Sequence, residues 1–232
     1  MILKKEHIPN IGRIEDNSFL TKEEKEFVTS FILKEQEYRY ALRKMSAKLE
    51  NLDDYCEMHF DHNPIHHIES RIKTASSLVE KIHRRGLNLS LDVLGNEIYD
   101  VAGIRVVCNY INDIYKIEQL LLTENDIEVL LRKDYILNPK DTGYRSLHDI
   151  YLLSINIDGE EKKIPIEIQF RTIAMDMWAS LEHELRYKSS NNLDEKDIFK
   201  LKTYSDMLYD IDLNMQRLYI KTVTGDSDND WF

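Results

Sequence analysis

The chain has few cysteines and no long apolar run, and each shortage excludes a class of protein. Its 232 residues include only Cys56 and Cys108, which form neither a disulfide framework nor a metal-finger spacing. No apolar run approaches the roughly 18 residues that a membrane helix needs, and the first ten residues lack the apolar core of a secretory signal. We therefore expect a cytoplasmic protein.

Glycine and positive charge are also scarce. The seven glycines form neither a Walker A loop nor a G-x-G-x-x-G run, so any phosphate must be held by arginine and lysine side chains. The net charge of -11 at pH 7 argues against a broad nucleic-acid or anionic-membrane surface, because a negative field repels polyphosphates at long range. A phosphate site must therefore be a local basic pocket.

The ends of the chain have helical spacing. Thr21 and Glu24 form a capping-box pattern, and apolar residues continue at helical spacing as far as Leu49, which predicts one long N-terminal helix. Asn63 followed by Pro64 predicts the start of a second helix that ends before Gly86 and has a basic polar side. Its apolar stripe would consist of Ile65, Ile68, Ile72, Ala75, Val79 and Ile82.

The middle of the chain has the period of strands. Residues 103–110, 127–136, 144–157 and 162–172 predict four strands, with a helix over 111–122 between the first two and two helices after the last. These elements indicate an α/β or α+β fold, a mixed sheet of about five strands flanked by helices. We expect a single domain with a helical extension (1–62), a core (63–190), a C-terminal helix (191–224) and a mobile acidic tail (225–232).

The strand predicted over residues 162–172 gives the strongest signal of chemistry. Isoleucines and Phe170 alternate there with Glu167, Gln169 and Arg171, so one face presents a carboxylate, an amide and a guanidinium in a row. Such a row is often only a solvated face. Its composition also suits a divalent metal, a hydrogen-bonded ligand edge and a phosphate.

Two further segments add groups of the same kind. Asp100 and Arg105 flank an Ala-Gly pair, and Asp100 together with Glu167 could share a Mg²⁺ ion, which prefers few carboxylates plus phosphate oxygens and water. The turn around Gly143 carries one ring for stacking and several cationic or ionisable groups, namely Tyr144, Lys140, Arg145 and His148. Both segments also have a purely structural interpretation, in which Asp100 is a turn residue and Tyr144 is a core residue.

The second predicted helix supplies cations. On an ideal helix Arg71, Lys81 and Arg85 fall within about 80° of one another, with Lys73 and Arg84 on a neighbouring stripe. A charged stripe is usually solvated, but here it accompanies a prospective metal pair and a stacking ring.

Four segments of the chain resemble the synthetase domain of the RelA/SpoT family. They are ESRIKTASSLVEKIHRR, DVAGIRVVC, RKDYILNPKDTGYRSLH and EIQFRTIAMDMWASLEHELRYK, which occur in the family's order between residues 63 and 188. The chain is most similar to the stand-alone small alarmone synthetases. The resemblance implies a nucleotidyltransferase-like fold, a homotetramer, and transfer of the β,γ-diphosphate of ATP to the 3′-hydroxyl of GTP or GDP.

The resemblance also implies roles for individual residues. Asp100 and Glu167 match the catalytic residues that hold Mg²⁺, with Glu167 as metal ligand, as base for the 3′-hydroxyl, or both. The positions that match ATP contacts are Arg71, Lys73, Arg84, Arg105 and Lys133. Those that match contacts of the GTP or GDP acceptor are Lys140, Tyr144, His148, Gln169 and Asp176, with Tyr144 stacking on guanine and Asp176 accepting from its N1-H and N2-H₂.

The match has departures and alternatives. Lys133 replaces an arginine of some relatives, which weakens bidentate phosphate binding, and Arg186 stands where a neutral residue is common. A catalytically inactive guanine-nucleotide sensor and a metal-dependent phosphohydrolase are the alternatives. The retained metal pair argues against the first, and the lack of chain for a separate hydrolase domain argues against the second.

The histidine-rich stretch from His59 to His67 raises the question of a separate metal site. His62 and His66 are four residues apart, but Pro64 lies between them and forces Asn63 out of the helical region, so a helical metal-ligand pair cannot form. We interpret the stretch as a linker that leads to Arg71.

Overall fold

The chain folds into a mixed sheet with helices on both sides. The computed structural model describes residues 2–4, 20–188 and 193–224, so the predicted acidic tail lies outside the described residues. The elements are β1 (Ile2–Lys4), α1 (Lys22–His59), β2 (Ile65–Ile72), α2 (Ala75–Arg84), the short 3-10 helix η2 (Leu91–Val93), β3 (Ala102–Cys108), α3 (Ile111–Leu121), β4 (Ile127–Asp134), β5 (Leu147–Ile157), β6 (Glu160–Thr172), α4 (Ile173–Lys188) and α5 (Glu195–Thr224).

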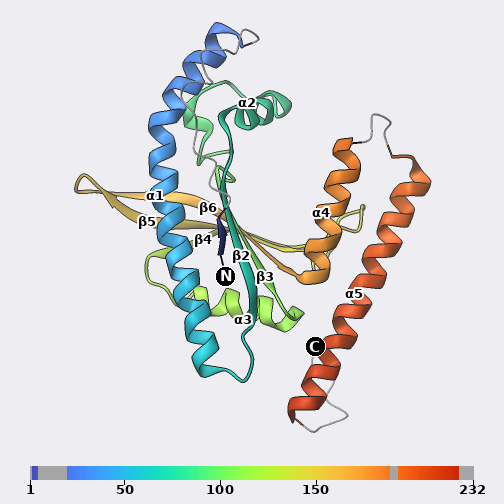
Figure 1. Cartoon of the computed structure of the whole chain (residues 1–232). Helices are drawn as coiled ribbons and strands as arrows, with labels where there is room; N and C mark the ends of the chain where they lie inside the picture. The colour runs from blue at the N-terminus through green and yellow to red at the C-terminus, as the bar shows by residue number, and fades with distance from the viewer. Residues whose placement is uncertain (1, 5–19, 189–192, 225–232) are drawn as a thin grey trace.

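The strands are arranged in the order β1-β2-β3-β6-β5-β4. The pairs β1/β2 and β3/β6 are parallel, and the other three are antiparallel. Figure 1 shows α1 along one side of the sheet and α4 and α5 on the other. The mixed sheet with flanking helices confirms the predicted fold class, with six strands, one of only three residues, in place of about five.

Helix α1 forms as predicted. The Thr21 side chain accepts from the Glu24 backbone N–H at 3.2 Å, and the Glu24 carboxylate accepts from the Thr21 N–H at 2.7 Å, so the capping box is complete. Its apolar stripe is buried against the sheet and consists of Phe27, Phe31, Tyr38, Leu42, Met45 and Leu49.

The helix predicted from Asn63 to residue 85 is wrong in its first half. Residues Ile65–Ile72 form β2, which pairs with β1 and β3, and helix α2 begins only at Ala75, capped by the Thr74 side chain. The Asn63 side-chain oxygen accepts from the Ile65 N–H at 2.9 Å, which makes a turn into a strand and not a helix cap.

A β-bulge explains the error. The β2/β3 register shifts between Ile65 and His67, so one extra residue separates Ile65 from the strand residues that follow. Ile68 and Ile72 are four apart and share a face of a regular strand, and the bulge turns Ile65 to that face as well. The i, i+3, i+7 spacing that resembles a helix is therefore also the pattern of a bulged strand.

The core lies on the side of the sheet covered by α1 and α3. Ile164, Ile166, Ile168 and Phe170 of β6 are all buried in it, as their alternation predicted. Helix α2 adds Leu78 and Ile82 to the same cluster. The opposite face of the sheet is thereby left to the polar residues. Within the described part of the chain, no helix is both long enough and apolar enough to cross a membrane.

Helix α5 holds the turn that precedes β5. The Ser205 hydroxyl donates to the Gly143 carbonyl at 2.5 Å, and Arg145 forms an ion pair with Asp206 at 2.9 Å. Gly143 has φ +92°, and a Cβ there would lie 2.9 Å from Ser205 Cβ and 3.0 Å from Lys202 Cα. Glycine is therefore required for both the backbone conformation and the close approach of α5.

A pair of carboxyl groups is buried between β5 and α3. Asp149 is 1% exposed and Glu118 is 6% exposed. Arg132 donates to Glu118 at 2.5 Å, and the Tyr151 hydroxyl donates to Asp149 Oδ2 at 2.7 Å. Burial, together with the charge of Glu118, raises the pKa of Asp149 to about 7.

We expect Gly143→Ala to lower the free energy of unfolding by about 2–4 kcal/mol, because it adds backbone strain and overlap with α5. Gly159→Ala is the matched control, since Gly159 also has a positive φ (+83°) but nothing lies within 4 Å of its added Cβ. Urea unfolding of both variants measures the difference. Equal losses would contradict the close packing of α5 on this turn.

We expect Asp149→Asn to raise the melting temperature at pH 8 by several degrees, at roughly 2–4 °C per kcal/mol. The pKa of Asp149 is raised on folding, so the folded chain keeps a proton that the unfolded chain releases, and stability falls as the pH rises from about 4 to about 7. The asparagine removes this loss and still accepts from Tyr151. Thermal unfolding at pH 5 and pH 8 tests this, and a gain that is no larger at pH 8 than at pH 5 would contradict it.

Candidate active site

One face of the sheet carries a row of polar side chains across five strands. The strand register pairs Glu69 with Arg105, Arg105 with Gln169, Gln169 with His148, and His148 with Lys133. Residues paired in register project from the same face. Four of the predicted site residues therefore lie side by side on β3, β6, β5 and β4, on the face opposite the core.

A second row runs parallel to the first. Arg71 pairs with Gly103, and Gly103 pairs with Glu167. The Arg71 side chain lies over the glycine, because a Cβ at Gly103 would be 3.8 Å from Arg71 Nε and 4.0 Å from the Glu167 carbonyl oxygen. The absence of a side chain at Gly103 leaves room for Arg71 over β3, and both Arg71 and Glu167 line the same cavity.

The parts of the two rows on β2, β3 and β6 form the floor of a cavity of about 520 Å³, and α4 forms its opposite wall. Five predicted site residues line it, namely Arg71, Arg105, Tyr144, Glu167 and Gln169. The other lining residues are Glu69, Ser70, Gly103, Ile104, Arg171, Ala179, Ser180, Glu182 and His183. Residues from the strands and from α4 thus enclose one space large enough for small-molecule ligands.

Asp100 lies in an ion-pair cluster at the start of β3. Its Oδ2 is 2.6 Å from Lys73 Nζ and 2.5 Å from Lys81 Nζ. Burial alone would raise the pKa of Asp100, but the hydrogen bonds and charges of the two lysines outweigh it and hold the pKa at about 2. Asp100 is therefore a carboxylate at neutral pH.

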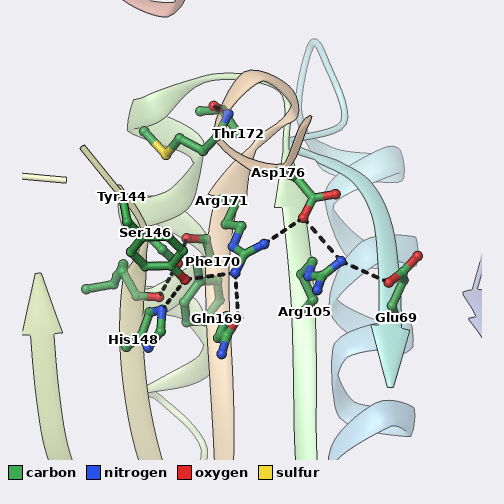
Figure 2. Close-up of polar contacts among 12 residues, drawn as sticks. Glu69, Arg105, Tyr144, Ser146, His148, Gln169, Phe170, Arg171, Thr172 and Asp176 are labelled. Carbon is green, nitrogen blue, oxygen red and sulfur yellow. Dashed lines mark hydrogen bonds and ion pairs between the residues drawn. The ribbon is translucent and has the colours of Figure 1, made fainter. Parts of the chain in front are cut away.

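Arg171 is the centre of a hydrogen-bond network (Figure 2). It is 5% exposed. Its Nη1 donates to Asp176 at 2.9 Å, and its Nη2 donates to the Tyr144 hydroxyl at 2.8 Å and to Gln169 Oε1 at 2.9 Å. The suggestion that this guanidinium would hold a phosphate is therefore not supported, because its terminal nitrogens already bind protein groups.

Asp176 joins this network to the first row. Its Oδ1 is also 3.2 Å from Arg105 Nη1, and Arg105 in turn lies 3.2 Å from Glu69 Oε2. The two arginines and two carboxylates alternate along the network in Figure 2. The guanidinium groups are thereby neutralised within the chain.

The residues around the Tyr144 ring are among those predicted to bind the GTP or GDP acceptor. The Tyr144 hydroxyl is 2.7 Å from His148 Nε2, and Lys140 Nζ is 4.7 Å from the centre of the Tyr144 ring. Burial, with the charges of Arg171, Lys140 and Lys133, lowers the pKa of His148 to about 3. His148 is therefore a neutral imidazole at physiological pH.

The remaining predicted residues lie outside the cavity lining. Lys73 and Asp100 form the ion-pair cluster, whereas Lys140, His148 and Asp176 contact residues that line the cavity. Arg84 is exposed on α2, and Lys133 is exposed on the outermost strand β4. The prediction that Arg71 and Arg84 share one helix is wrong, because Arg71 lies on β2.

Three residues of this region, Lys81, Arg171 and Glu69, were not among the predicted site residues. Lys81 was part of the predicted basic stripe, and Arg171 was part of the alternating row, so both had a signal. Glu69 lies on a segment that was interpreted as a helix, and only the strand alternation of β2 would have placed it beside Arg105.

The two carboxylates proposed for Mg²⁺ each keep a free oxygen. Asp100 Oδ1 is buried without a hydrogen-bond partner among the described residues. Glu167 Oε2 accepts from Gln169 at 2.8 Å, whereas Oε1 lies 3.7 Å from His148 Nδ1. Carboxylate oxygens are the ligands that Mg²⁺ prefers together with phosphate oxygens and water. Glu167 lines the cavity and Asp100 lies outside its lining, and no group of three or more His, Cys, Asp or Glu in residues 2–4, 20–188 and 193–224 could hold a metal.

The histidine-rich stretch has other contacts. His59 is the last residue of α1, and His62 Nε2 lies 3.0 Å from both carboxylate oxygens of Asp113. His62 Nδ1 is 2.5 Å from the Tyr219 hydroxyl of α5. His62 therefore joins α3 and α5 through hydrogen bonds.

Comparison with known proteins gives consistent results. The family described as "Region found in RelA / SpoT proteins" matches residues 70–192. The GTP pyrophosphokinase YwaC of Bacillus subtilis is 36% identical over 178 residues, which are 77% of this chain and 85% of YwaC.

Solved structures agree with this match. Small alarmone synthetase 1 from Bacillus subtilis bound to its product pppGpp is similar with a TM-score of 0.72 and 34% identity, over 78% of this chain and 92% of that one. The same synthetase bound to AMPCPP gives a TM-score of 0.69 and 30% identity, over 84% and 99% of the two chains. With more than half of its residues matched, and with these relatives aligned over most of their length, the chain belongs to the RelA/SpoT family.

Proposed function

We propose that the chain is a GTP pyrophosphokinase that makes the alarmone (p)ppGpp. It transfers the β,γ-diphosphate of ATP to the 3′-hydroxyl of GTP or GDP and releases AMP. The observation that carries the proposal is one cavity that holds a carboxylate (Glu167), two cations (Arg71 and Arg105) and a flat ring (Tyr144). The name of YwaC and the pppGpp and AMPCPP complexes of a related synthetase support the same substrates.

The donor side consists of cations. Arg71 and Arg105 hold the ATP phosphates inside the cavity, and Lys73 reaches them from the Asp100 cluster. Phosphate oxygens take the place of Glu69 beside Arg105, which keeps its contact with Asp176. Arg84 and Lys133 contribute from the exposed ends of α2 and β4.

The acceptor side is built around Tyr144. Its ring stacks on guanine, and Lys140, which lies over the same ring, holds an acceptor phosphate. Gln169 and the neutral His148 border the ribose. Asp176 reads guanine with Oδ2, because its Oδ1 binds Arg171 and Arg105.

The reaction takes place at Glu167. We assign the bound Mg²⁺ to Asp100 and Glu167, and when present this ion would neutralise phosphate charge. The Glu167 carboxylate takes the proton of the 3′-hydroxyl while that oxygen attacks the β-phosphorus. The bond from the β-phosphorus to the oxygen of the α-phosphate breaks, and its electron pair leaves with AMP. Because both substrates are cytoplasmic nucleotides, we place the enzyme in the cytoplasm of a bacterium.

We expect Glu167→Gln to reduce transfer by about 10²–10⁴-fold, because a positioned proton acceptor contributes about that factor. The assay follows label from γ-labelled ATP into a guanosine product in the presence of Mg²⁺. Glu161→Gln is the control, since Glu161 is exposed at the far end of the same face of β6. A wild-type chain that binds GTP without forming product would favour a sensor, and release of free phosphate would favour a phosphohydrolase.

Helices α4 and α5 carry exposed apolar side chains that support a homotetramer. On α5, Tyr204, Met207, Ile211, Met215 and Leu218 are each at least half exposed and fall within about 80° of the helix circumference. Helix α4 adds Ile173, Met177, Leu181 and Leu185 at a spacing of four. Exposed apolar surface of this kind is typical of subunit interfaces, and we propose that copies of this chain cover it.

We expect Ile211→Glu combined with Met215→Glu to convert the oligomer to smaller species, because each buried charge in an apolar interface is costly. Light scattering after size-exclusion chromatography measures the mass. Arg217→Glu, an exposed change outside the apolar arc, should leave the mass unchanged. A monomeric wild-type chain at micromolar concentration would contradict the proposed tetramer.

A further inference from the structure

We propose that Arg171 is a positioning residue that orients the carboxylate of Glu167 through two arms, of which the first is hydrogen-bonded throughout and the second ends at a 3.7 Å contact. One arm passes through Gln169, and the other passes through the hydroxyl of Tyr144 and the ring of His148. This proposal rests on the functions proposed above for Glu167 and Tyr144. It assigns to the Tyr144 hydroxyl a role that stacking by its ring does not require.

The first arm follows one face of β6. Arg171 Nη2 donates to Gln169 Oε1 at 2.9 Å, and Gln169 Nε2 donates to Glu167 Oε2 at 2.8 Å. An amide has one oxygen acceptor and one nitrogen donor, so the guanidinium sets the amide's orientation and directs its N–H toward the carboxylate. The three residues are spaced by two along a strand, which places them on the same face.

The second arm crosses to β5. Arg171 Nη2 donates to the Tyr144 hydroxyl at 2.8 Å, so that hydroxyl directs its single proton to His148 Nε2 at 2.7 Å. A neutral imidazole that accepts at Nε2 carries its proton on Nδ1. This Nδ1 faces Glu167 Oε1 at 3.7 Å, longer than a hydrogen bond and within reach of a small movement when substrate binds.

Arg171 can orient both arms because burial and a hydrogen bond to Asp176 fix its own position. It is 5% exposed, and its Nη1 donates to Asp176 at 2.9 Å, which balances its charge. Its planar guanidinium directs several donors in fixed directions, whereas a lysine has one flexible ammonium group. The anchor of Glu167 is thus an ion pair between the buried Arg171 at the end of β6 and the half-buried Asp176 at the start of α4.

The arrangement connects the base-binding ring to the reacting carboxylate. Guanine stacked on Tyr144 restricts the ring, and the hydroxyl of that ring is bonded to both Arg171 and His148. Acceptor binding therefore orders the groups that hold Glu167. The guanine base does not react, but the free energy of its binding is used to orient the reacting carboxylate of Glu167.

Tyr144→Phe tests this proposal because it keeps the ring and removes the hydroxyl. We expect kcat to fall by about 10–100-fold, the usual effect of removing a group that orients an active-site ligand. The Kd for GDP from calorimetry and the melting temperature should stay close to wild type, since stacking and packing are retained. The control is Tyr135→Phe, which should keep wild-type kcat. The Tyr135 ring lies 6.1 Å from that of Tyr144, and its hydroxyl has no hydrogen bond to any residue that the structure describes.

Arg171→Lys provides the second measurement. We expect it to lower kcat at least as much as Tyr144→Phe, and the double variant to lose no more than the larger single loss, because both changes interrupt the same arms. Wild-type kcat in Tyr144→Phe would overturn the proposal, as would a loss that follows a parallel loss of GDP affinity and stability. If the wild-type chain makes no guanosine product, the proposed function itself fails. If it makes the product and Tyr144→Phe keeps wild-type kcat, only the positioning role of Arg171 fails.

Discussion

The parallel pairing of β3 with β6 is the constraint on which the active site depends. It sets Gly103 opposite Glu167 and Arg105 opposite Gln169. The same register buries Ile104 and Ile168 on the other face, where α1 and α3 cover them. A slip of one residue would turn the polar residues into the core, so the apolar face stabilises the position of each polar group.

The charges of the candidate site are balanced within the chain. Asp100 pairs with Lys73 and Lys81, and Asp176 pairs with Arg105 and Arg171. Partly buried cations without partners would be costly, and these carboxylates offset that cost. This explains how a chain with a net charge of -11 can contain a concentrated group of cations.

The segment from Asn63 to Arg85 shows where local pattern was insufficient. Its apolar spacing fits a helix, yet the pairing of Ile65–Ile72 with β3, 30 or more residues away in the chain, makes it a strand. Arg71 nevertheless reaches the cavity, because the strand turns every second residue to the polar face. Arg71 therefore lines the cavity, although the prediction that it lies on a helix is wrong.

The amino-acid sequence by itself determined the long helix α1, the strands β3 to β6 and the buried and polar faces of β6, because these follow from the spacing of neighbours along the chain. It also carried the motifs that show the family. Only the tertiary structure decided that β2 is a strand, that Lys81 pairs with Asp100, and that Arg171 is buried and hydrogen-bonded to protein groups. Strand pairing, burial and ion pairs join residues that are distant in sequence, and local periodicity contains no information about which distant residues meet.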